Sequence, residues 1–64
     1  MKESFQELFN ISKTEGQGLT FFIRGHVIPA LFIKLIDDEA VEISNQMYDR
    51  MIIRLDCIDA LALN

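Results

Sequence analysis

The sequence predicts a mostly β domain in which one short helix is followed by five short strands. Two observations carry this prediction. From residue 19 onward, short runs rich in Phe, Ile, Val and Leu are separated by small turn signals. Within them, the segment 41–44, Val-Glu-Ile-Ser, alternates apolar and polar residues as a half-buried strand does. Before residue 19, apolar residues recur instead at helical spacing.

The expected helix covers about residues 4–14. Ser4 and Glu7 fit a capping box in which Ser4 is the N-cap residue. Gly16 then ends the element, since glycine is the commonest residue after a helix C-terminus. Three apolar side chains share one face of this helix at i, i+3 and i+4 spacing: Phe5, Leu8 and Phe9.

The rest of the chain is expected to form five strands joined by short turns. The strands are expected at residues 19–24, 27–36, 39–45, 48–54 and 57–63. The turns are expected at residues 25–26, 37–38, 46–47 and 55–56.

A helical alternative begins at Pro29, which is well tolerated at the first position of a helix. One apolar stripe would then run at steps of three and four: Phe32, Ile36, Ala40, Ile43, Met47 and Met51. The many β-branched residues in this region favour the sheet, because their side chains lose rotamer freedom in a helix. Pro29 favours the helix, because proline inside a central strand removes a ladder hydrogen bond.

The length of 64 residues allows one domain, which would bury only about 60% of the surface of its unfolded chain. Domains this small usually need a disulfide, a metal or a partner subunit. Cys57 is the only cysteine and His26 the only histidine, so an intrachain disulfide and a multi-ligand Cys/His zinc site are excluded. Self-association is the remaining source of stability, and half of the residues are hydrophobic.

The net charge of −4 is unfavourable for a protein that coats DNA, because non-specific phosphate binding depends on excess Lys and Arg. No apolar stretch reaches the roughly 18 residues that cross a bilayer, so no membrane partner is expected. The lone cysteine fits a reducing compartment, and we expect a cytoplasmic protein.

Catalytic chemistry has few candidate groups, and we expect no enzyme and no cofactor. His26 would be the only imidazole base, and it lies in an expected turn. The acidic run 37–39 has the composition of a solvated turn and lacks further carboxylates for a metal ion. Cys57 is expected to be a buried, inert thiol in the last strand. Arg24 and Arg54, each at a strand end, remain as candidates for binding.

Residues 53–58, Ile-Arg-Leu-Asp-Cys-Ile, resemble the second motif of the Sm, LSm and Hfq proteins, with Leu55 in place of a glycine. The first motif has an echo in Gly25, in Ala30 where a glycine usually bends the second strand, and in the apolar pair of the third strand. The asparagine with which Sm proteins contact a base has no counterpart here.

The resemblance implies a small five-stranded, strongly bent SH3-like (Sm-like) barrel over about residues 19–63, preceded by the helix. It also implies a homo-oligomeric ring that closes through the last two strands and binds single-stranded RNA, or DNA, in nucleic-acid processing. Arg54 and Asp56 are the positions that would contact a base, and Asp37 and Asp38 would support them from the neighbouring loop. The alternative is an oligomeric scaffold that binds protein and no nucleic acid.

Overall fold

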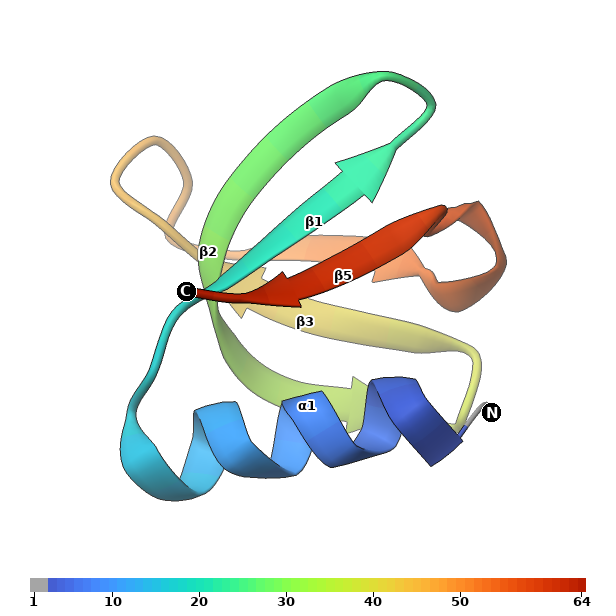
Figure 1. Cartoon of the computed structure of the whole chain (residues 1–64). Coiled ribbons are helices and arrows are strands. Elements are labelled where there is room, and N and C mark those ends of the chain that lie inside the picture. The colour runs from blue at the N-terminus through green and yellow to red at the C-terminus, as the bar shows by residue number, and fades with distance from the viewer. Residues whose placement is uncertain (1–2) are drawn as a thin grey trace.

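The computed structural model describes residues 3–64 and confirms a mostly β fold with an N-terminal helix (Figure 1). A short 3-10 helix, η1, lies between the last two strands. The elements are α1 (Glu3–Glu15), β1 (Leu19–Ile23), β2 (His26–Ile36), β3 (Ala40–Ser44), β4 (Met51–Arg54), η1 (Leu55–Cys57) and β5 (Ala60–Leu63).

Helix α1 ends where the sequence predicts, but its start differs. Gly16 has φ +67, and the Gln17 N–H donates to the Ser12 carbonyl at 3.2 Å, as in a Schellman C-cap. The helix already includes Glu3, so the prediction that Ser4 is its N-cap is wrong. Helix starts are defined only to within one or two residues, because terminal turns have few backbone hydrogen bonds.

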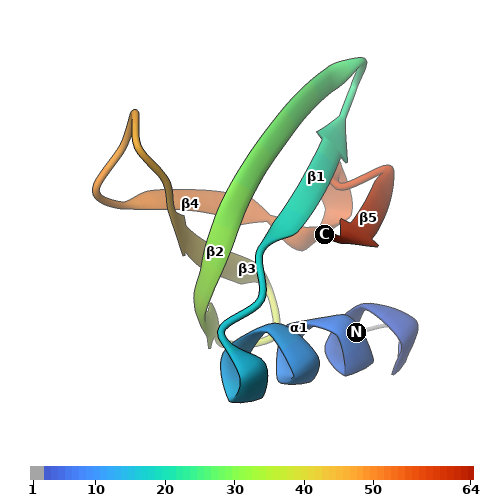
Figure 2. The same cartoon turned by 60° about the vertical axis from the view of Figure 1, so that its left-hand side comes forward.

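The five strands form one open antiparallel sheet in the order β4-β3-β2-β1-β5. Strand β2 pairs with β1 along its first half and with β3 along its second half. A register shift between Phe32 and Lys34 marks an irregularity of the β-bulge type, which increases bending and twist. In Figures 1 and 2, β2 accordingly sweeps from the tip of the β1–β2 hairpin down to α1.

The β1–β2 hairpin turns through Arg24 and Gly25, one position earlier than predicted. Both residues have positive φ, 49° and 85°, as the two central residues of a type I′ turn require. This turn type leaves Ile23 and His26 as a hydrogen-bonded pair. His26 is therefore the first residue of β2 rather than part of the turn.

The helical alternative is wrong, because Pro29 lies inside strand β2. Hydrogen-bonded pairs alternate along an antiparallel ladder, so Pro29 directs its backbone away from β1. Its carbonyl accepts instead from Asn45 Nδ2 at 3.2 Å. The missing N–H therefore removes no hydrogen bond from the β1–β2 ladder, which is the condition under which a strand tolerates proline.

The last two strands are shorter than predicted. Asn45 Oδ1 accepts hydrogen bonds from the backbone N–H groups of Met47 and Tyr48, which holds residues 45–48 as a loop. Strand β4 therefore begins only at Met51. Cys57 belongs to η1 and is half-buried, so the prediction of a buried thiol in the last strand is wrong.

The core lies between the sheet and α1, which runs across one end of the sheet and packs against β2 and β5 (Figure 1). Phe9 is only 1% exposed and stacks on Phe32 and Phe21, with ring centroids 4.9 and 6.3 Å away. The other large side chains that are fully buried come from the sheet: Leu19, Phe21, Val41 and Ile43. Within residues 3–64, no helix has the length and apolarity needed to cross a membrane.

Candidate functional site

The β2–β3 turn and the β4–η1 junction lie together at one end of the sheet. The Leu55 N–H donates to the Glu39 carbonyl at 2.8 Å, and Ala40 pairs with Arg54 in the β3–β4 ladder. We call this region, residues 37–39 and 54–56, the Arg54 end. It contains all four residues that the resemblance implicated: Arg54, Asp56, Asp37 and Asp38.

Arg54 is the exposed cation of this end. Its Nε lies 3.7 Å from Asp56 Oδ1, and its Nη2 donates to Cys57 Sγ at 3.4 Å. The side chains of Arg54 and Asp56 are 72% and 78% exposed, so the ion pair contributes little to stability. The hydrogen bond to Cys57, with the electrostatic influence of Cys57 and Asp56, raises the pKa of Arg54. Arg54 therefore stays positively charged at any working pH.

The backbone aims Asp37 and Asp38 outward in a tight turn. Both have positive φ, 50° and 58°, which aspartate tolerates better than most non-glycine residues. Both are exposed, as is Glu39, whose N–H closes the turn on the Ile36 carbonyl at 3.0 Å. The Arg54 end thus carries one cation and four carboxylates, a charge balance that repels phosphate groups.

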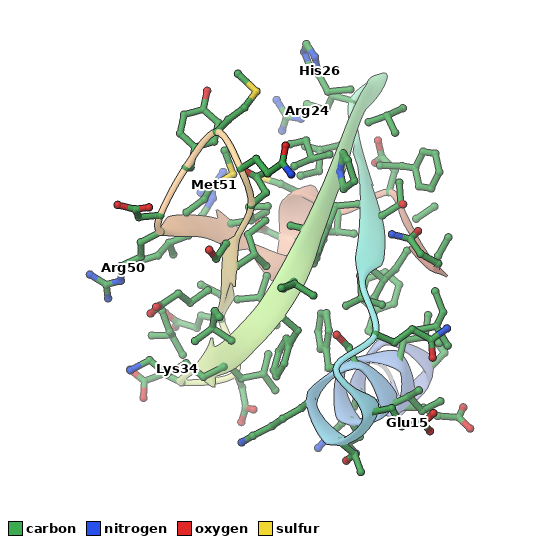
Figure 3. All side chains as sticks on the ribbon, turned by 90° about the vertical axis from the view of Figure 1, so that its left-hand side faces the viewer. Glu15, Arg24, His26, Lys34, Arg50 and Met51 are labelled. Atoms are coloured by element: carbon green, nitrogen blue, oxygen red, sulfur yellow. The ribbon has the colours of Figure 1, made fainter. Side chains whose placement is uncertain are left out.

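Arg24 occupies a different position, at the tip of the β1–β2 hairpin beside His26 (Figure 3). Its backbone N–H donates to Asp59 Oδ2 at 2.7 Å, which joins the hairpin to the segment before β5. The more literal Arg-Gly pair of the sequence is therefore a hairpin turn, as its position in the chain predicts.

A second feature is an open groove of about 860 Å³ between the first half of β2 and the loop that follows β3. We call it the β2 groove. Several exposed apolar side chains line it, and none of its lining residues is Asp, Glu, Lys or Arg. Its exposed lining includes Val27 (60% exposed), Leu31 (50%), Met47 (80%), Tyr48 (48%) and His26.

The sequence does not reveal the β2 groove, because the groove joins two segments that are separate in the chain. The sequence also predicts residues 48–50 in a strand rather than in a loop. A signal is present in Asn45-Gln46 and Asp49, polar residues that interrupt the apolar pattern and indicate a longer loop.

Within the part of the chain that the structure describes, no three His, Cys, Asp or Glu side chains are grouped to hold a metal ion. The comparisons with known proteins return no matching family model, no matching curated protein and no matching solved structure.

Proposed function

We propose that this protein is a divergent Sm-like subunit that assembles into a homo-oligomeric ring and binds single-stranded RNA without catalysing a reaction. A helix followed by five antiparallel strands, with a long bent second strand, supports the fold part of the proposal. The resemblance of residues 53–58 to the second Sm motif supports the family. A cytoplasmic location belongs to the same proposal, because the lone Cys57 suits a reducing compartment.

One observation carries the binding site: the 2.8 Å hydrogen bond between the Leu55 N–H and the Glu39 carbonyl. It holds the two loops together, so an exposed arginine lies beside carboxylates that can accept hydrogen bonds from base amino groups. The 54–56 loop alone would present Arg54 with one carboxylate, Asp56, and the 37–39 turn adds three more.

Free sheet edges support the ring. Strands β4 and β5 end the sheet on its two sides, and in the described part of the chain each has one unpaired backbone edge. Ile52 of β4 is 50% exposed, and β5 consists only of alanine and leucine. Pairing β4 of one subunit with β5 of the next would cover both edges. It would also repeat Arg54 around the ring axis, so that several weak contacts act together.

The charge of the Arg54 end favours contact with bases over contact with phosphates. Four carboxylates repel the backbone of a nucleic acid, whereas an arginine plane can stack on a base of a flexible single strand. We therefore expect weak dependence of affinity on salt, since that dependence scales with the phosphates neutralised. Single-stranded DNA is the alternative ligand, and a DNA oligomer of the same sequence separates the two.

The test is the substitution Arg54→Ala, measured by fluorescence anisotropy with a short oligouridine while light scattering monitors the assembly. Loss of the arginine should weaken binding by about tenfold or more, because each subunit loses its stacking group. Arg24→Asn removes the same charge from the other turn and should leave affinity unchanged. Unchanged affinity of an intact Arg54→Ala assembly would remove the Arg54 end from the proposal.

The second candidate is an oligomeric protein scaffold without nucleic-acid binding. The observation that favours it is the four carboxylates around a single cation at the Arg54 end. The interaction of these charges with phosphate is least screened at low ionic strength. A wild-type assembly that binds neither oligouridine nor the matching DNA at low or at moderate salt would favour this scaffold over the RNA-binding ring.

A further inference from the structure

The first half of β2 has a backbone edge that no strand within residues 3–64 covers. Residues 26–30 pair with β1 on one side, while pairing with β3 begins only at Leu31. Because alternate residues of an antiparallel strand point to opposite neighbours, Val27 and Pro29 direct their backbone groups into the β2 groove. The chain leaves this position open because it turns away from β2 at Asn45, directly after β3.

This edge already accepts a hydrogen bond of the kind that a strand would supply. The Asn45 side-chain amide donates to the Pro29 carbonyl at 3.2 Å. The N–H and carbonyl of Val27, two residues closer to the hairpin tip, lie on the same edge. An entering backbone could therefore replace the Asn45 amide and pair with Val27, which is how a peptide adds to an exposed sheet edge.

The walls of the β2 groove specify the side chains of its occupant. Apolar groups line both sides, with Val27 and Leu31 on β2 and Met47 and Tyr48 on the loop. Since no lining residue is Asp, Glu, Lys or Arg, apolar side chains of a ligand fit along the groove. His26 lines the groove at the hairpin tip and Arg24 lies beside it (Figure 3), so an acidic residue fits at this end.

The bound segment cannot already be paired in another sheet, because β2 lies on one side of it and the loop after β3 on the other. Residues 3–64 of a second copy consist of a helix, paired strands and short connections, and so offer no free extended segment. We propose that the β2 groove binds an extended, apolar segment of another protein. This segment adds as a short strand beside the first half of β2, which β3 does not reach because it ends at Ser44.

The test starts from the full chain and a phage-displayed library of random peptides of about ten residues. Enriched peptides should alternate apolar residues and carry an acidic residue near one end. The best peptide is then synthesised and titrated against wild type and two variants. Leu31→Asp places a charge on the groove wall and should weaken binding by about tenfold or more. Ile33→Asp is the matched control, since Ile33 is exposed on the same strand outside the groove.

Backbone methylation of the peptide tests strand addition on the unaltered protein. Methyl groups on the amides that face β2 should abolish binding, whereas methyl groups on the intervening amides should be tolerated. Val27→Asp, at a side chain 60% exposed, replaces Leu31→Asp if circular dichroism shows that variant to be unfolded.

Any one of three results would overturn the inference. The first is a phage selection that enriches no peptide, and the second is a peptide that binds Leu31→Asp as tightly as wild type. The third is an affinity that does not depend on which backbone amides of the peptide are methylated. An empty selection together with a smaller assembly of Leu31→Asp would assign the β2 groove to a second copy instead. These outcomes are separate from the proposed function, because no nucleic acid is present in the experiment.

Discussion

Arg24 and Gly25 form a two-residue turn in which both backbones are left-handed, with φ 49° and 85°. Glycine adopts this conformation without strain, whereas a residue with a Cβ atom encounters its own carbonyl there. Added side-chain atoms would meet open space at Gly25, so its conformation alone explains the glycine. At Arg24 the turn accepts a residue that is not the best for it, since Asn-Gly is the preferred pair for a type I′ turn.

We therefore expect Arg24→Asn to stabilise the protein. Asparagine tolerates the left-handed region better than arginine, and the gain in the free energy of unfolding should be about 0.5–1 kcal/mol. Urea denaturation followed by circular dichroism measures it. Arg50→Asn is the control, because it removes the 3.1 Å ion pair with Glu42 and should give no gain. A lower stability of Arg24→Asn would show that the arginine side chain makes a contact worth more than the strain.

Strands β4 and β5 are the elements through which we propose that the protein self-associates. Each has four residues and one unpaired edge, and their exposed apolar residues have no charged neighbour within the strand except Arg54. Natural edge strands are usually protected by charges, bulges or covering segments. The absence of such protection within β5 is consistent with pairing to another subunit.

The substitution Ile52→Lys should break the proposed homo-oligomer. Ile52 is half-exposed on edge strand β4, and a lysine there places a charge in the expected strand-to-strand contact. Light scattering should show the assembly falling to monomers while the circular dichroism spectrum is retained. Ile33→Lys makes the same exchange at an exposed position of β2, away from both edges, and should leave the mass unchanged. Equal masses for both variants and wild type would contradict assembly through β4.

At the scale of the whole molecule, one helix side chain joins α1 to both halves of the bent sheet. Phe9 stacks on Phe21 of β1 and on Phe32 of β2. A chain of 64 residues has a total stability of only about 3–10 kcal/mol at typical values per residue. Loss of a single core contact that contributes a few kcal/mol would therefore remove a large fraction of the free energy of unfolding.

Phe9→Ala should unfold the protein or nearly so, because removing a buried phenylalanine costs about 3–5 kcal/mol. Thermal denaturation followed by circular dichroism would show a transition at a much lower temperature, or none. Phe5→Ala is the matched control on the same helix, where the side chain is only half-buried at the edge of the core. A transition temperature as high for Phe9→Ala as for Phe5→Ala would mean that α1 does not stabilise the sheet.

The sequence by itself determined the class of the fold and most of its elements. Apolar spacing located α1, alternation located β3, and Gly16 and Gly25 marked two chain reversals, because these signals depend on neighbouring residues. Resemblance also named residues that the fold then brought together at the Arg54 end.

Only the tertiary structure decided which strand edges stay open and what surrounds each candidate group. Pro29 is tolerated because its backbone faces away from β1, and residues 48–50 leave the strand because Asn45 binds the loop backbone. Cys57 is half-buried because η1 turns the chain before β5. The acidic surroundings of Arg54 and the β2 groove depend on segments that are distant in the chain, and local sequence patterns do not report such contacts.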